Sequence, residues 1–169
     1  MRAGFIGAGK VGFSLGKYLK ENGVEITGYF SKSPESAKSA ADFTNTKLYK
    51  SIEDILSDSD TLFITVPDGQ ISKVWDYMKN LDIKNKNCSG SISSTVFFDG
   101  ENLGANIYSV HPLYAISDKC ESWKHLNKAY FTVEGSAENL DEIKSIFERA
   151  GNKVIAMGAE NKSLYHCGA

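Results

Sequence analysis

The chain has 169 residues, 41% hydrophobic and 24% charged, so it can bury a core of ordinary size. Its net charge of −2, with acidic and basic residues interspersed, excludes the basic face that nucleic-acid binding requires. No apolar leader precedes the first expected strand, and the longest apolar runs are too short to span a bilayer. The three cysteines show no metal-ligand spacing. We therefore expect a cytoplasmic protein with free thiols, no metal, and no nucleic-acid or membrane partner.

The first 33 residues follow the pattern of a strand, a glycine turn, a helix and a second strand. An apolar strand ends at Ile6, and residues 7–12 read Gly-Ala-Gly-Lys-Val-Gly before helical spacing begins. In such a unit the first glycine allows a tight turn, the second lets the backbone approach a pyrophosphate, and the third lets the helix pack closely. The pattern predicts a dinucleotide loop at Gly7, Ala8, Gly9, Lys10 and Val11; a tight turn without a ligand is the alternative.

Hydrophobic spacing and capping residues predict the remaining elements in chain order. They are strand 24–30, helix 33–43, strand 47–49, helix 51–57, strand 61–66, helix 71–78, strand 85–88, a turn at 89–91, helix 94–98, strand 106–110 ended by 111–112, an irregular stretch 113–128, strand 129–134, helix 140–150, strand 153–157 and a helix from 160 onward. This alternation predicts an α/β fold with a doubly wound, mostly parallel sheet and extra C-terminal strands. We expect a dinucleotide-binding domain over residues 1–157. Residues 158–169 would begin a helical domain that is truncated here.

The end of the second strand indicates which dinucleotide the site prefers. NAD sites place an acid there to bond the ribose 2′-hydroxyl, whereas this chain has Ser31, Lys32 and Ser33, with no acid before Glu35. An acid ~4 Å from a 2′-phosphate would cost roughly 4 kcal/mol per unit charge at an effective dielectric of 20. Hydroxyls and a lysine avoid that repulsion, so NADP is favoured over NAD. The alternative is a solvated turn that only caps a helix.

Three later turns are expected at the same edge of the sheet, beside the cofactor. Val66 and Pro67 end the strand 61–66, and a plain strand terminator is the alternative reading. Ser89, Gly90 and Ser91 form the candidate substrate-binding turn.

His111 follows the strand 106–110, and histidine suits the proton transfer that must accompany hydride transfer at neutral pH. We therefore expect His111 to be catalytic; a histidine that merely closes a strand is the alternative. Lys162 and His166 lie four residues apart, so one helix face would present both to a carboxylate or a carbonyl group. An exposed polar helix face is the alternative for this pair.

Several motifs together resemble a known family. They are, in order, residues 4–12 (Gly-Phe-Ile-Gly-Ala-Gly-Lys-Val-Gly), 31–33 (Ser-Lys-Ser), 66–68 (Val-Pro-Asp), 89–90 (Ser-Gly), 111–113 (His-Pro-Leu), 129–135 (Ala-Tyr-Phe-Thr-Val-Glu-Gly) and 162–166 (Lys-Ser-Leu-Tyr-His). The chain resembles a bacterial family of predicted NADP oxidoreductases, with a Rossmann-like N-terminal domain and a helical C-terminal domain of unknown function. That family is similar to pyrroline-5-carboxylate reductase, prephenate dehydrogenase and the β-hydroxyacid dehydrogenases.

The resemblance implies roles for the candidate residues. The loop at residues 7–11 would hold the pyrophosphate, residues 31–33 the adenosine phosphate, and Pro67 would flank the nicotinamide. Ser89, Gly90, His111, Lys162 and His166 would line the substrate side. The second position of the Lys–Asn helix pair of the β-hydroxyacid dehydrogenases is His166 here, so the catalytic role does not transfer directly. In these relatives a helical domain follows and builds a homodimer.

The sequence leaves three functions in competition. The first is an NADP-dependent oxidoreductase acting on a C=O or C=N group of a small, carboxylate-bearing substrate. The second is an NADP(H)-binding sensor or scaffold without turnover. The third, a methyltransferase, is disfavoured because its ligand's ribose usually requires an acid at the end of the second strand.

Overall fold

The computed structural model describes residues 1–90, 94–97, 99–135 and 140–156. The strands are β1 (Arg2–Ile6), β2 (Glu25–Phe30), β3 (Lys47–Leu48), β4 (Thr61–Ile64), β5 (Asn87–Gly90), β6 (Asn106–Leu113), β7 (Tyr130–Gly135) and β8 (Lys153–Ala156). The α-helices are α1 (Lys10–Glu21), α2 (Pro34–Thr44), α3 (Ile52–Asp58), α4 (Asp68–Met78) and α5 (Leu140–Arg149). Short 3₁₀ helices are η1 (Ser94–Phe97), η2 (Glu101–Leu103) and η3 (Ser122–Lys128).

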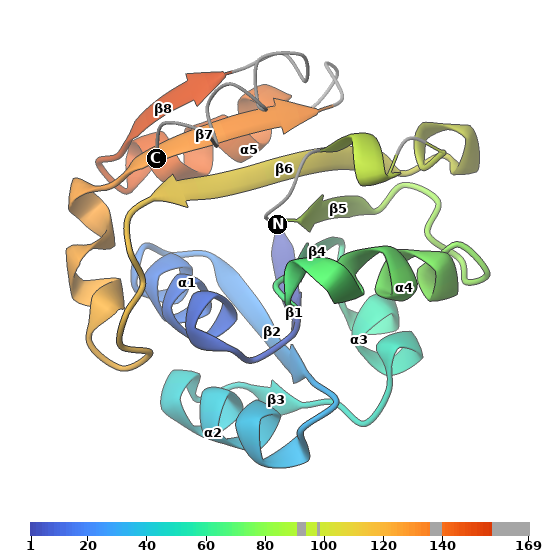
Figure 1. The fold of residues 1–169 in the computed structure, drawn as a ribbon, viewed down its shortest axis with the longest axis horizontal. Coiled ribbons are helices and arrows are strands. Elements are labelled where there is room, and N and C mark those ends of the chain that lie inside the picture. Colours follow the sequence, from blue (N-terminus) through green and yellow to red (C-terminus); the bar gives the residue numbers. More distant parts are fainter. Residues whose placement is uncertain (91–93, 98, 136–139, 157–169) are drawn as a thin grey trace.

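All eight described strands form one sheet in the order β3-β2-β1-β4-β5-β6-β7-β8 (Figure 1). The first six strands are parallel and follow the order typical of dinucleotide-binding folds. β7 pairs antiparallel with β6, and β8 pairs parallel with β7. The predicted doubly wound, mostly parallel sheet with extra C-terminal strands is confirmed.

The strand register defines where a ligand can sit. Ile6, Ile64, Gly90 and Ser109 lie level across β1, β4, β5 and β6, near the carboxyl ends of these strands. From β1 the sheet continues to β2 and β3 on one side, and from β4 it continues to β5 and β6 on the other, so the strand order reverses between β1 and β4. Ligands of open α/β sheets bind outside the carboxyl ends of the strands at such a point. The glycine turn after Ile6 is therefore at the expected position for a ligand.

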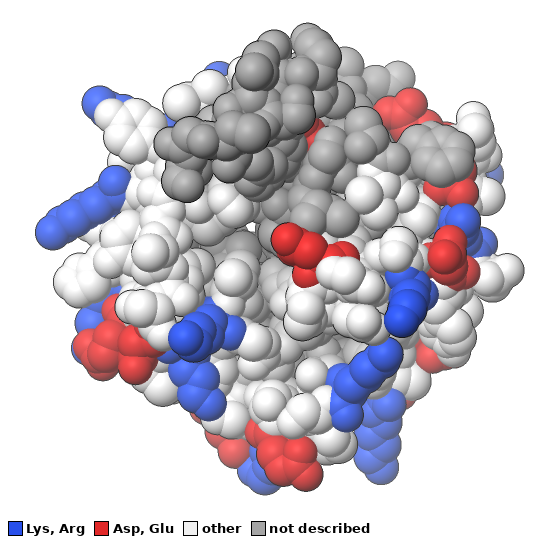
Figure 2. All heavy atoms as spheres, viewed as in Figure 1, with Lys and Arg blue, Asp and Glu red and all other residues white. Residues whose placement is uncertain are grey.

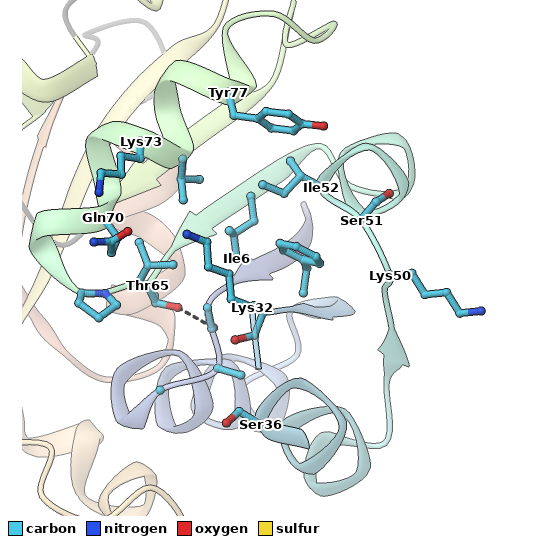
Figure 3. Close-up of a pocket in the computed structure, with 18 of the residues that line it drawn as sticks. Ile6, Lys32, Ser36, Lys50, Ser51, Ile52, Thr65, Gln70, Lys73 and Tyr77 are labelled. Atoms are coloured by element: carbon cyan, nitrogen blue, oxygen red, sulfur yellow. Dashed lines mark hydrogen bonds between the residues drawn. The ribbon is translucent and has the colours of Figure 1, made fainter. Parts of the chain in front are cut away.

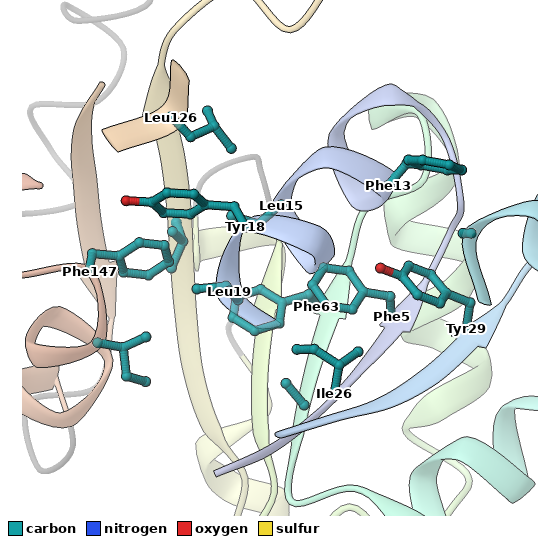
Figure 4. Close-up of a cluster of buried hydrophobic side chains, with 14 of the residues drawn as sticks. Phe5, Phe13, Leu15, Tyr18, Leu19, Ile26, Tyr29, Phe63, Leu126 and Phe147 are labelled. Atoms are coloured by element: carbon teal, nitrogen blue, oxygen red, sulfur yellow. The ribbon is translucent and has the colours of Figure 1, made fainter. Parts of the chain in front are cut away.

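Helices cover both faces of the sheet because each face buries alternate apolar side chains of the strands. One core lies under α1, α2, η3 and α5 and contains Phe5 and Phe63 of the sheet, whose rings stack 5.1 Å apart (Figure 4). The other core lies under α3, α4 and η1 and contains Ile64 and Trp75. The two cores therefore pack against the sheet on both of its faces.

Two expectations at this edge were wrong. Ser89 and Gly90 were expected in a turn, but they belong to β5, which pairs with β4 and β6 on both sides. This pairing overrides the poor strand propensity of the Asn-Cys-Ser-Gly sequence.

The strand before His111 was expected to end there, but β6 continues through His111 and Pro112 to Leu113. Beyond Ser109, β6 is paired with β7 but no longer with β5, so the missing N–H of Pro112 is tolerated. The stretch 113–128, expected to be irregular, also contains η3.

The helix starts agree with their capping signals. Ser33 caps α2 by accepting a hydrogen bond from the Ser36 N–H at 3.3 Å, and Ser51 caps α3 through the Asp54 N–H at 3.1 Å.

Acidic and basic side chains are interspersed over the face seen in Figure 2. Within the described part, no helix is long and apolar enough to cross a membrane.

Candidate functional site

A cavity of about 650 Å³ opens at the carboxyl edge of the sheet, between the glycine turn, α4 and the start of α3 (Figure 3). Seven of the ten residues predicted to bind the cofactor line it: Gly7, Ala8, Gly9, Ser31, Lys32, Val66 and Pro67. Lys10, Val11 and Ser33 are not among its lining residues. The structure therefore brings the turn after β1, the end of β2 and the end of β4 into one site.

The glycine turn has little freedom to vary at its first and last positions. Gly7 has φ of +109°, and a Cβ there would lie 2.7 Å from the Thr65 backbone. A Cβ on Gly12 would lie 2.3 Å from Thr65 Oγ1, which itself donates a 2.9 Å hydrogen bond to the Gly7 carbonyl. These two glycines are explained by packing of α1 and β1 against the end of β4.

Gly9 has no such explanation within the protein. Its φ is −75°, which any residue adopts, and a Cβ there would meet no atom within 4 Å. Gly9 is exposed at the start of α1, where no described side chain caps the helix and the first turn holds no acid. The open space and the uncapped N–H groups fit a phosphate approaching the backbone.

Of the three residues that follow β2, Ser33 caps a helix, and Ser31 and Lys32 line the cavity. Ser33 Oγ accepts from the Ser36 N–H and donates to Glu35 Oε2 at 3.1 Å, so its hydroxyl is occupied by the cap of α2. Ser31 and Lys32 line the cavity, together with Ser36. Ser33 thus caps α2, whereas Ser31 and Lys32 stay candidate ligand residues, and Ser36 joins them.

Two lysines that the sequence analysis did not predict also border the cavity. They are Lys50, before α3, and Lys73, on α4. Figure 3 shows Lys32 and Lys73 extending into the space below α4, while Lys50 points away from the other labelled side chains. Glu53 is the acid among the lining residues, so the cavity carries a net positive charge. Lys73 lies 41 residues beyond Lys32 in the chain, and no local sequence signal relates the two.

One end of the cavity is walled by apolar side chains. Ile52, Val74 and Tyr77 line it from α3 and α4. The Tyr77 hydroxyl donates a hydrogen bond to the Glu53 carboxylate, which joins the two helices at this end. This hydrogen bond lowers the pKa of Glu53 and raises that of Tyr77. A flat aromatic group such as a purine fits an apolar wall with a positively charged neighbour.

Of the residues predicted for substrate chemistry, the described ones (Ser89, Gly90 and His111) are not among the residues that line this cavity. Ser89 is buried, and its Oγ has no hydrogen-bond partner among the described residues. Gly90 packs against Phe97, because a Cβ there would lie 2.9 Å from the ring. His111 is half-buried, two residues beyond the Ser109 that lies level with Gly90. Ser91, Lys162 and His166 lie outside the described residues, so their roles stay predictions.

The fold and the site together define an α/β protein with a Rossmann-type sheet, a glycine turn at its switch point and a basic cavity beside it. Residues 2–86 match the family described as "NADP oxidoreductase coenzyme F420-dependent". The chain belongs to this oxidoreductase family. The sequence matches no curated protein at a significant level.

Solved structures share the fold at low sequence identity. 3-Hydroxyisobutyrate dehydrogenase from Mycobacterium tuberculosis superposes with a TM-score of 0.80 at 18% identity, over 99% of this chain and 59% of that one. Prephenate dehydrogenase from Aquifex aeolicus gives 0.77 at 20% identity, over 94% and 62%. A reductive aminase from Aspergillus terreus, solved with NADPH and ethyl-5-oxohexanoate, gives 0.74 at 12% identity, over 98% and 58%. The chain thus spans about three fifths of the length of each of these proteins.

Proposed function

We propose that the chain binds NADP(H) in this cavity and transfers a hydride to or from a C=O or C=N group of a small, carboxylate-bearing substrate. The observation that carries the proposal is the cavity itself, where Gly9, Ser31 and Lys32 meet without an acid at the end of β2. The pyrophosphate would lie at the start of α1, and the 2′-phosphate near Ser31, Lys32 and Ser36. NADP supplies the hydride chemistry, and the chain supplies orientation and a path for the proton.

The names of the similar structures support this class of reaction. They include a dehydrogenase of a hydroxy acid, prephenate dehydrogenase, and an aminase that was solved with NADPH. The carboxylate in the proposed substrate matches the first two and the predicted Lys162–His166 pair. By the same resemblance we propose a cytoplasmic homodimer whose interface is formed by a following helical domain.

Fluorescence titration with NADPH and NADH tests cofactor binding directly. We expect NADPH to bind with a dissociation constant in the micromolar range and NADH at least tenfold more weakly. If neither binds below millimolar, the chain is not a dinucleotide-binding protein. NADPH binding without turnover of any 2-oxo acid, cyclic imine or hydroxy acid by the full-length protein would favour the sensor function.

Among the described residues, we propose His111 as the proton donor to the substrate. His111→Ala should lower turnover of a substrate found in that panel by about 10²- to 10⁴-fold, the usual contribution of general acid–base catalysis, with NADPH affinity unchanged. Unchanged turnover would reduce His111 to a structural residue. His125→Ala is the matched control, because His125 is exposed on η3.

A further inference from the structure

The acid that lines the cavity, Glu53, has no part in the function proposed so far. A carboxylate does not help to hold a pyrophosphate or a 2′-phosphate, because like charges repel each other. The described residues that line the cavity nevertheless include a single acid, Glu53, together with three lysines, Lys32, Lys50 and Lys73. An acid in these surroundings calls for a part of the ligand that is not an anion.

A structural role in α3 explains the presence of an acid but not its direction. Glu53 lies in the first turn of α3, where a negative charge interacts favourably with the helix dipole. Asp54 lies in the same turn and serves the dipole equally well, yet it does not line this cavity. Glu53 is instead turned toward α4, where its Oε1 accepts a hydrogen bond from the Tyr77 hydroxyl.

The course of α4 places this hydrogen bond at the end of the cavity that is farther from the glycine turn. α4 begins shortly after Thr65, whose Oγ1 donates a hydrogen bond to the Gly7 carbonyl. Gln70 lines the cavity near the start of α4 and Tyr77 near its end, as Figure 3 shows. At 1.5 Å per residue, the rise from Gln70 to Tyr77 is about 10 Å. A phosphate at the glycine turn would therefore lie away from the acid.

The part of a dinucleotide that would reach this end is its adenine base. With the 2′-phosphate near Ser31 and Lys32, the base on the same ribose would extend into the rest of the cavity. Ile52, Val74 and Tyr77 give that part an apolar wall. Tyr77 is 48% exposed, so a purine beside it would cover apolar surface. The 6-amino group at the edge of adenine is a hydrogen-bond donor.

The Glu53 carboxylate is charged and has acceptor capacity for this donor. The hydrogen bond from Tyr77 lowers the pKa of Glu53, so the group is ionised at neutral pH. An ionised carboxylate accepts up to about four hydrogen bonds and donates none. Tyr77 also holds the carboxylate in place, because its hydroxyl joins α4 to this side chain of α3.

We propose that Glu53 recognises the adenine of the dinucleotide by accepting a hydrogen bond from its 6-amino group, and that Tyr77 positions the carboxylate for this contact. The proposal rests on the proposed NADP(H)-dependent function and adds a determinant of base specificity to it. Hypoxanthine carries a carbonyl oxygen at position 6 of the purine. A cofactor with this base would turn an acceptor toward the carboxylate, which would lose its donor.

The test is a fluorescence titration with NADPH and with its hypoxanthine counterpart, in which oxygen replaces the 6-amino group and N1 carries a hydrogen. The wild type should bind NADPH about tenfold more tightly, because the hydrogen bond to a charged acceptor is lost with hypoxanthine. Glu53→Gln should bring this ratio to about one, since an amide can accept from the amino group or donate to the carbonyl oxygen.

Tyr77→Phe tests the positioning role, because it keeps the aromatic ring and removes the hydroxyl that holds Glu53. The ratio should fall to about threefold, as the carboxylate is present but no longer fixed. A merely structural role would weaken both cofactors equally and leave the ratio unchanged. Asp54→Asn is the matched control, since it removes the neighbouring acid of α3, and its ratio should equal that of the wild type.

Equal affinities of the wild type for the two cofactors would overturn the proposal. Tighter binding of the hypoxanthine form would also overturn it, because Glu53 would then meet the N1–H of that base. A tenfold ratio that persists in Glu53→Gln would assign the discrimination to another residue and overturn the role of Glu53. The two proposals fail separately: the dinucleotide function fails if the wild type does not bind NADPH, whereas base recognition fails on the ratio while NADPH still binds.

Discussion

At the scale of single residues, Gly9 differs from Gly7 and Gly12, because nothing within the described fold requires a glycine at its position. Gly7 and Gly12 face the Thr65 backbone and side chain at distances no Cβ could keep, whereas Gly9 faces open space. A glycine that neither its φ nor its packing requires indicates that something outside the protein approaches the backbone there.

Gly9→Ala should therefore abolish NADPH binding while leaving the protein folded. The expected loss of unfolding free energy is within about 1 kcal/mol, because alanine is a poorer helix cap than glycine. Gly12→Ala should instead cost about 1–3 kcal/mol from overpacking. Chemical denaturation and NADPH fluorescence on both variants check this contrast, and NADPH binding by Gly9→Ala would contradict the role given to Gly9.

Lys32 is the residue expected to select the phosphate. Lys32→Asp should raise the NADPH dissociation constant by at least tenfold with little effect on NADH, because the new carboxylate repels the 2′-phosphate. Lys73→Gln should weaken NADPH to a smaller extent, since Lys73 also extends into the cavity (Figure 3). Isothermal titration with both cofactors measures this, with exposed Lys128→Asp as control. Equal losses for NADPH and NADH would remove the argument for phosphate selection.

At the scale of elements, the start of α2 shows how one short motif serves both helix and ligand. Ser31, Lys32 and Ser33 are consecutive, but only the first two line the cavity, since Ser33 caps the helix. The motif places the candidate phosphate ligands directly before a helix start, where backbone N–H groups also favour an anion.

Ser33→Ala should act on stability rather than on the cofactor. Losing the cap should lower the free energy of unfolding by about 1 kcal/mol, while NADPH affinity changes less than threefold. Urea denaturation and NADPH titration measure the two effects. Exposed Ser57→Ala near the end of α3 serves as the control. A large loss of NADPH affinity with unchanged stability would make Ser33 a ligand residue after all.

At the scale of the whole molecule, two helical layers bury the middle strands of the sheet on both sides. Cys88 lies in the core under α3 and α4, and burial raises its thiol pKa to about 12. Cys120 lies in the loop before η3 and is partly exposed.

Thiol labelling should report this burial. At pH 8 the raised pKa leaves a negligible thiolate fraction at Cys88, so iodoacetamide should modify Cys120 but not Cys88 in the folded chain. Peptide mapping by mass spectrometry measures both sites. In denaturant both should react, which is the control for reactivity. On the proposed function, NADPH binds the folded state alone, and it should then slow any labelling of Cys88 that depends on global unfolding. Rapid labelling of Cys88 in the folded chain would contradict the packed core.

Much of the fold was predictable because its signals are local. The glycine turn, the Ser33 and Ser51 caps and the helical spacing of α5 each lie within a few residues, and the structure confirms them. The failures at Ser89 and His111 arose because their strand state depends on pairing with distant strands. The same holds for the site, since Lys32 after β2 and Lys73 on α4 line one cavity only once the sheet and its helices have assembled.

The sequence by itself determined the α/β class, the dinucleotide turn and the basic end of β2, because turns, caps and periodicity are read within one element. The tertiary structure decided which of the candidate residues share a cavity, and that Ser89, Gly90 and His111 lie in paired strands rather than in turns. The physical reason is that these relations depend on register and on helix packing, which join residues that are far apart in the chain.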